Sequence, residues 1–262
     1  MILRHLSAMV LVSLVALSAG CGMLPEKSDE TRDWSAQKLY SEARGALNDG
    51  NYSQSVGYYE KLEARYPFGK YAQQAQLEIA YAYYKDEEPD SALAALDRFI
   101  KLNPRHPNID YALYLKGLVN YNRGQGLVER FLPVDPADRD PGAALQSFED
   151  FSQLVRQYPE SSYAEDARQR MLYLRNNLAL HELRVAKYYM RRGAYVAAAN
   201  RAKYVVENYP RTPAVPDSLS VLAKAYRELG LKEFADDAMR VLRTNHPEHP
   251  GVSEAGRTLG DG

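Results

Sequence analysis

The sequence predicts an all-α fold, a solenoid of about five helix-turn-helix units. The first observation is an interval of 17 residues between a glycine and a proline, which occurs four times, and a fifth time with Glu87 in the place of the glycine. A small residue follows five positions after each start, and an apolar residue follows twelve positions after it. A pattern in which side-chain size recurs at a fixed period while the residue types differ is typical of stacked repeats that share one core.

The five units can be aligned position by position. They start at Gly50, Glu87, Gly142, Gly193 and Gly230 and end at Pro67, Pro104, Pro159, Pro210 and Pro247. The small positions are Ser55, Ala92, Ser147, Ala198 and Ala235, and the apolar ones are Leu62, Phe99, Leu154, Val205 and Leu242. Seven residues before the start stand Ala43, Ala80, Ala186 and Ala223, with Gly117 in the middle unit if an insertion is allowed.

This alignment has a physical explanation in helical hairpins. Small residues let two helices approach closely, a glycine ends the first helix in a left-handed conformation, and a proline ends the second. Two of the proline intervals are 37 residues, close to the ~34 of a tetratricopeptide repeat. We therefore expect a tetratricopeptide-repeat solenoid; the alternative is an unrelated helical bundle with chance spacings.

The N-terminus indicates export and lipidation. Residues 1–20 combine Arg4 with an apolar stretch from Leu6 to Ala19, which is typical of a signal peptide. Cys21 is the only cysteine, and "SAGC" looks like a lipobox, although Ser18 stands where leucine is usual. We expect Cys21 to carry a diacylglycerol and an acyl lipid, with no other cofactor. The alternative is an ordinary signal peptide cut elsewhere.

The remaining domain boundaries follow from composition and from the two long proline intervals. Residues 21–33 are polar and are expected to form the lipidated cysteine and a flexible tether. Repeats 1–3 are expected over 34–160. The interval from Pro104 to Pro159 exceeds the regular 37 residues by 18, and we expect these 18 residues to form an inserted loop at 124–141. Repeats 4–5 are expected over 161–250 and begin with a helix lengthened by 14 residues, or two heptads. A disordered tail is expected at 251–262.

Charge and composition exclude several kinds of partner. The chain has 33 basic and 34 acidic residues, and this balance disfavours a nucleic-acid partner or a membrane bound through basic residues. The 21 tyrosines against 6 phenylalanines suggest half-buried surfaces, because tyrosine has an apolar body and a polar tip. We expect most tyrosines to pack helix on helix and the rest to line grooves.

Several stretches, among them "RYPFGKYAQQAQLEIAYAYYK", "FEDFSQLVRQYP" and "YYMRRGAYVAAANRAKYVVENYP", resemble the BamD family. These are tetratricopeptide lipoproteins of the Gram-negative outer-membrane β-barrel assembly machine, and the likeness covers roughly residues 31–250. The resemblance implies a lipid-anchored scaffold on the periplasmic face of the outer membrane, whose partners are the POTRA domains of BamA, the lipoproteins BamC and BamE, and unfolded β-barrel proteins. Gly22, after the cysteine, fits the outer-membrane sorting pattern.

The resemblance also suggests binding residues. A receptor for barrel proteins, which end in alternating apolar residues and an aromatic, needs aromatic pockets and a cation for the terminal carboxylate. For substrate binding we expect, on adjacent ridges of the N-terminal repeats, Phe68, Tyr71, Arg98, His106, Asn108 and Tyr111. These residues could instead only shape the turns beside Pro67 and Pro104. The resemblance implies that Arg201 contacts BamA. Alternatively, Arg201 is an ordinary solvent-exposed charge on the surface of a helix.

Competing functions have weaker support. His246 and His249 have a metal-ligand spacing, but two prolines interrupt the helix that the spacing requires. Asp135, Asp138 and Asp140 could act as paired carboxylates of a glycosidase, but aspartates near prolines are more often turn residues. We therefore expect neither a metal site nor an enzyme. The second hypothesis is another periplasmic tetratricopeptide lipoprotein, linking envelope complexes or binding peptidoglycan.

Overall fold

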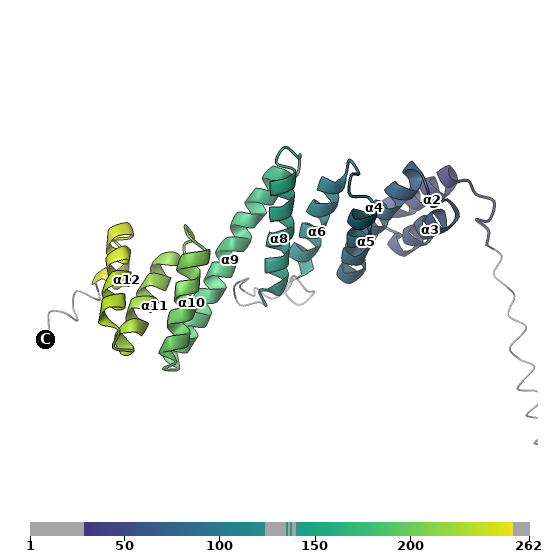
Figure 1. Cartoon of the computed structure of the whole chain (residues 1–262). Coiled ribbons are helices and arrows are strands. Elements are labelled where there is room, and N and C mark those ends of the chain that lie inside the picture. The colour runs from purple at the N-terminus through teal and green to yellow at the C-terminus, as the bar shows by residue number, and fades with distance from the viewer. Residues whose placement is uncertain (1–28, 124–134, 136, 138–139, 254–262) are drawn as a thin grey trace, which may run out of the picture.

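The computed structural model describes residues 29–123, 135, 137 and 140–253, and the regular structure in this part of the chain is helical. The helices pair into antiparallel hairpins that follow one another in chain order along an elongated molecule (Figure 1). The hairpins are α2 (Ala36–Asn48) with α3 (Tyr52–Arg65), α4 (Lys70–Lys85) with α5 (Pro89–Leu102), α6 (Ile109–Arg123) with α8 (Gly142–Gln157), α9 (Ala164–Arg191) with α10 (Tyr195–Asn208), and α11 (Val215–Glu228) with α12 (Lys232–Asn245). The predicted tetratricopeptide solenoid is confirmed. None of the described helices is both long and apolar enough to cross a membrane.

The turn inside a hairpin requires a left-handed residue. Gly50, Gly193 and Gly230 have φ of 80°, 71° and 73°, and Glu87 adopts φ 59° at the equivalent position. The backbone conformation is therefore a property of the repeat, and glycine is only its least strained occupant. The prediction is wrong for Gly142, which is the first residue of α8 and lacks a positive φ, because the insertion separates it from the end of α6.

Each second helix ends in the same way. The residue before the proline donates its backbone N–H to the carbonyl of the recurrent apolar position four residues earlier, as in Tyr66 to Leu62 at 2.8 Å and His246 to Leu242 at 2.8 Å. The same bond recurs in the three other hairpins, from Asn103, Tyr158 and Tyr209. The following proline then stops the helix because it has no N–H to donate.

The small positions lie where the helices of a hairpin approach most closely. All five are buried, with 0% or 1% exposure, as are the five apolar positions. In two hairpins the small residue is a serine that bonds to the facing helix: Ser55 donates to the carbonyl of Ala43 at 2.8 Å, and Ser147 donates to that of Gly117 at 2.9 Å. Gly117 thus occupies the position that the alignment assigned to it.

The core has two parts that meet inside α9. The first cluster of buried side chains runs from Leu39 to Leu174, and the second runs from Ala179 to Leu242. The long helix α9 contributes its first half to one cluster and its second half to the other. Three hairpins therefore share one core with the start of α9, and two hairpins share the other.

The inserted loop and the lengthened helix contact each other. Asp135 accepts a hydrogen bond from the guanidinium of Arg184, and the carbonyl of Ala137 lies 2.9 Å from Nδ1 of His181. Ala137 is only 1% exposed, so this part of the insertion packs closely on α9. The other residues of 124–141, except Asp140 and Pro141, lie outside the described residues.

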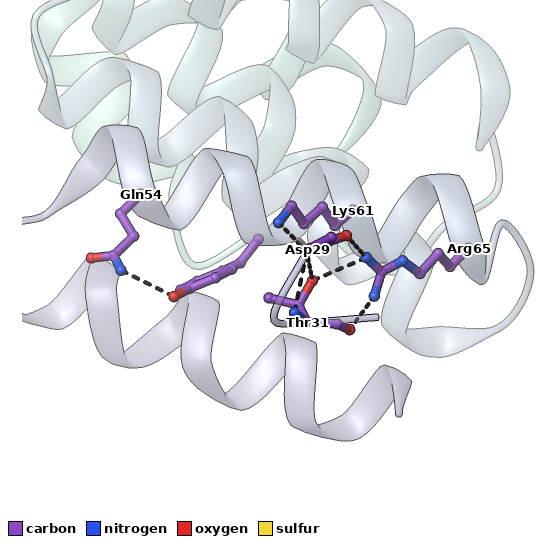
Figure 2. A network of polar contacts seen from close by, with 6 residues as sticks. Asp29, Thr31, Gln54, Lys61 and Arg65 are labelled. Atoms are coloured by element: carbon purple, nitrogen blue, oxygen red, sulfur yellow. Dashed lines mark hydrogen bonds and ion pairs between the residues drawn. The ribbon is translucent and has the colours of Figure 1, made fainter. Parts of the chain in front are cut away.

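Ordered structure begins before the first helix and continues past the last one. Asp29 accepts hydrogen bonds from Lys61 and Arg65 of α3, and Arg65 also donates to the carbonyl of Thr31 (Figure 2). At the other end Gly251 is buried, and Val252 packs on the second core. Within the predicted tether and tail, residues 29–33 and 251–253 therefore belong to the fold, while 21–28 and 254–262 lie outside the described residues.

Candidate functional site

A groove of about 410 Å³ opens on the N-terminal repeats. It lies between the first helices of neighbouring hairpins, since its walls come from α4, from the turn before α6 with the start of α6, and from the turn before α9. Direct contacts between α2 and α4 and between α4 and α6 place these helices in one layer. The lining residues are Gln74, Leu77, Glu78, Tyr81, Pro107, Asn108, Asp110, Tyr111, Ser162 and Tyr163.

Tyrosine rings form much of this lining. The rings of Tyr111 and Tyr163 lie 5.5 Å apart, and Tyr163 stacks on Tyr114 with centroids 4.8 Å apart. Burial raises the pKa of the Tyr111 hydroxyl, and the neighbouring Tyr81 and Glu78 add to this effect. The Tyr111 hydroxyl is therefore protonated at neutral pH and available as a donor and an acceptor.

Two carboxylates complete the lining. Glu78 Oε1 accepts a hydrogen bond of 3.0 Å from the amide of Gln74, one helical turn away. Asp110 accepts from the backbone N–H of Tyr111 at 2.7 Å and from the hydroxyl of Ser161 at 2.6 Å. The groove thus combines aromatic faces, amide groups and negative charge, which is suited to binding an extended polar segment.

The structure brings only part of the predicted substrate-binding set into this groove. Asn108 and Tyr111 line it. Tyr71 packs on Tyr40 of α2, with ring centroids 5.4 Å apart, and is half-buried. His106 packs edge-on against Phe99 at 5.1 Å, and its Nδ1 accepts the backbone N–H of Asn108 at 3.1 Å. His106 therefore shapes the turn that presents Asn108.

Phe68 and Arg98 lie outside the groove lining. Phe68 is 91% exposed in the turn between α3 and α4, which is unusual for a phenylalanine. Arg98 of α5 forms an ion pair with Glu63 of α3 at 2.8 Å, on the layer of second helices. These two residues remain predictions for substrate contact, at places separate from the groove.

Arg201, the predicted partner-binding residue, has a carboxylate partner within the chain. Its Nη1 donates to both oxygens of Glu182 at 2.9 and 3.2 Å, which joins α10 to α9. The side chain of Arg201 is 48% exposed, whereas that of Glu182 is 15% exposed. One edge of the guanidinium is therefore occupied, and its exposed part faces away from the core.

Sequence reasoning missed Glu78, Tyr81 and Tyr163 as groove residues. Gln74, Glu78 and Tyr81 are spaced by four and three residues, so one face of α4 presents all three. This periodicity could have grouped them on one face. It could not have shown that Tyr163, which is 82 residues after Tyr81 in the sequence, lies in the groove wall opposite this face.

The residues of the alternative functions have structural roles in the described part of the chain. His249 Nε2 lies 2.8 Å from Asp217 Oδ1, and Asp140 accepts from the N–H of Gly142 at 3.1 Å at the start of α8. Asp135 binds Arg184, as described above, and Asp138 lies outside the described residues. Cys21, the predicted lipidation site, also lies outside them.

Comparison with known proteins gives one family. The family model described as "YfiO: Outer membrane lipoprotein" matches residues 32–242. A relative from Neisseria meningitidis serogroup A, named outer membrane protein assembly factor BamD, is 47% identical over 92% of this chain and 91% of its own length. The protein of that name from Vibrio cholerae is 39% identical over 90% of this chain and 97% of its own.

A solved tetratricopeptide repeat protein from Parabacteroides merdae is 16% identical, with a TM-score of 0.39, over 84% of this chain and 67% of that one. The curated relatives are named for assembly and not for a catalysed reaction. The match to the family model extends from the N-terminal turn to the last turn of α12. This chain therefore belongs to the outer membrane lipoprotein family that includes the BamD assembly factors.

Proposed function

We propose that this chain is a lipid-anchored scaffold for the assembly of outer membrane β-barrel proteins. Its N-terminal repeats receive segments of unfolded barrel proteins, and its C-terminal repeats hold BamA through the POTRA domains. BamC and BamE are further lipoprotein partners, and the anchor is a lipid on Cys21 at the periplasmic face of the outer membrane. The names of the relatives support the assembly role.

The groove on the N-terminal repeats is the observation that supports the receptor role. A volume of about 410 Å³ holds a few side chains of a peptide. Tyrosine faces bind apolar and aromatic side chains, while amide groups such as those of Gln74 and Asn108 bind a peptide backbone. The alternative, a lipoprotein that links other envelope complexes or binds peptidoglycan, is disfavoured by membership of the assembly-factor family.

Fluorescence titration of a peptide with a barrel-protein ending tests the receptor role. Tyr111→Ala should weaken binding because it removes a ring from the groove. If Phe68 and Arg98 extend the site toward the terminal aromatic and the carboxylate, Phe68→Ala and Arg98→Ala should weaken binding as well. Because Phe68 is 91% exposed, its loss should change stability little, which separates a binding effect from an unfolding effect.

Matched controls come from the C-terminal repeats. Phe234 is 57% exposed on α12, and Arg240 forms a surface pair with Asp237 on the same helix. Phe234→Ala and Arg240→Ala should leave peptide affinity unchanged. Unaltered affinity in the folded Tyr111, Phe68 and Arg98 variants would contradict the receptor role of these repeats.

A further inference from the structure

The charges in the groove have one sign. Among the described residues that line it, the charged ones are Glu78 and Asp110, and there is no lysine, arginine or histidine. Neutral groups donate hydrogen bonds to these carboxylates: the amide of Gln74, the hydroxyl of Ser161 and the backbone N–H of Tyr111. A positive charge to note is Arg44 of α2, which interacts with the same Tyr40 hydroxyl as Glu78 does. Arg44 does not line the groove.

A similar combination of tyrosines and a carboxylate beside the groove binds an arginine of the chain itself, Arg170. The guanidinium of Arg170 lies 4.9 Å from the ring centre of Tyr121 and bonds to Asp166 at 2.5 Å, and the Tyr114 hydroxyl donates to the same carboxylate at 2.7 Å. A tyrosine face, a carboxylate and a tyrosine hydroxyl thus hold an arginine of the chain itself. Tyr114 stacks on Tyr163 of the groove wall, so the two arrangements are adjacent.

We propose that the groove binds an extended peptide segment through a lysine or arginine side chain of that segment, which lies against the tyrosine rings and pairs with Glu78 and Asp110. The groove contains the components of the Arg170 arrangement without a cation in its lining. A cation over an aromatic face gains further from a nearby carboxylate. The inference deepens the proposed receptor role and rests on it.

The same charges disfavour a peptide carboxylate in this groove. Two carboxylates line it, so a third negative group would meet like charges in a partly desolvated space. A terminal carboxylate has a separate predicted partner in Arg98, outside the groove. The specificity of the groove is therefore for a basic side chain, and the neighbouring rings accept the apolar residues beside it.

A set of peptides that differ at one position tests this inference. We would titrate labelled peptides carrying arginine, citrulline or glutamate at a central position, with amidated C-termini, and one arginine-free peptide with a free C-terminus. Citrulline keeps the shape of arginine without its charge. The arginine peptide should bind about tenfold more tightly than the citrulline peptide, with the glutamate peptide weakest, and added salt should reduce the difference.

Glu78→Gln is the informative variant, and Glu63→Gln is its control. Both change a half-buried carboxylate of the N-terminal repeats, but Glu63 lies on α3 and pairs with Arg98 away from the groove. Glu78→Gln should remove most of the preference for arginine over citrulline while keeping the helical circular dichroism, and Glu63→Gln should retain that preference.

The outcomes separate the inference from the proposed function. Equal affinities for the arginine and citrulline peptides would overturn the inference and leave the receptor role in place. Binding of none of the peptides would overturn both. Retention of the full preference in Glu78→Gln would also overturn the inference, because the charge assigned to recognition would then have no effect.

Discussion

At the scale of single residues, closeness of approach decides which side chains the repeat accepts. A Cβ built on Gly117 would lie 2.5 Å from the ring of Phe151, which is fully buried. The other four hairpins have alanine at this position: Ala43, Ala80, Ala186 and Ala223. The middle hairpin has instead a glycine, which leaves room for the ring of Phe151.

We expect Gly117→Ala to lower the thermal unfolding temperature. Overpacking against Phe151 costs about 1–3 kcal/mol, which exceeds the gain of up to ~1 kcal/mol from replacing glycine in a helix. Gly45→Ala is the control, since Gly45 lies in α2 with no atom within 4 Å of the position that the new methyl group would take, and it should be neutral or stabilising. Equal melting of the two variants would contradict the close contact.

The pairing of Arg201 permits a charge-exchange experiment. Arg201→Glu should weaken co-purification of BamA and also lose the pair with Glu182. Adding Glu182→Arg restores an ion pair between α9 and α10 with reversed sign, but not an arginine at position 201. If Arg201 contacts BamA, the double variant should recover stability and not co-purification. Recovery of both would show that Arg201 only joins the two helices.

At the scale of elements, the irregular segments of the solenoid are fastened to regular helices by charged groups. Residues 29–33 bind α3, the insertion binds α9 through Asp135, and the segment after α12 binds α11 through His249 and Asp217. The hydrogen bond from Arg184 is the main reason that the pKa of Asp135 is lowered. Polar contacts therefore help to determine where these segments lie.

The C-terminal contact predicts a dependence on pH. Burial raises the pKa of Asp217, but hydrogen bonds from Lys187 and His249 outweigh burial and leave the pKa below its ordinary value. A carboxylate with a lowered pKa stabilises the folded state above about pH 4 and loses this contribution as the pH falls through its folded-state pKa. Ionised Asp217 therefore stabilises the C-terminal repeats at neutral pH.

Asp217→Asn should accordingly be less stable than the wild type at pH 7, and the difference should shrink as the pH is lowered below about 4. Thermal unfolding of both proteins at a series of pH values measures this. Asp237→Asn on the exposed face of α12 should show a much smaller difference at pH 7, because its side chain is 65% exposed. A constant difference between wild type and Asp217→Asn at all pH values would contradict the assigned role of the charge.

At the scale of the whole molecule, the two cores on α9 separate the two proposed tasks. The groove lies on hairpins of the first core and Arg201 lies on a hairpin of the second, so α9 connects the proposed substrate side with the proposed BamA side. Tyr163 of the groove directly precedes α9, and Glu182, the partner of Arg201, lies 19 residues further, which is ~28 Å along the helix.

The anchor is the prediction that concerns the whole chain. Seven residues separate Cys21 from Asp29, and eight residue steps reach at most ~28 Å, so the described fold would stay close to a lipid anchor. Cys21→Ser should leave the helical content unchanged and release the protein into the soluble fraction, since stable attachment takes more than one acyl chain and the variant would have none. Membrane retention of this variant after a carbonate wash would contradict the lipid anchor.

Among the candidate-site residues, sequence reasoning identified Asn108 and Tyr111 as lining the groove, and it did not find the residues opposite them. The positions beside repeat ends could be recognised because prolines mark them. Tyr81 and Tyr163 have no such mark. Whether a tyrosine packs in the core, as the fully buried Tyr59 does, or lines a groove depends on helices that are distant in sequence.

The sequence alone determined the all-α repeat architecture, the small and apolar positions of each hairpin, and the two places where the repeat is irregular. It could do so because these features are local: a close helix contact restricts side-chain size, a left-handed turn restricts φ, and proline ends a helix. Only the tertiary structure decided that three tyrosines and two carboxylates meet in one groove, that Asp135 and Ala137 of the insertion contact α9, and that Arg201 pairs with Glu182. The environment and charge partner of a side chain depend on residues from other helices, and the repeat pattern does not encode which of them face it.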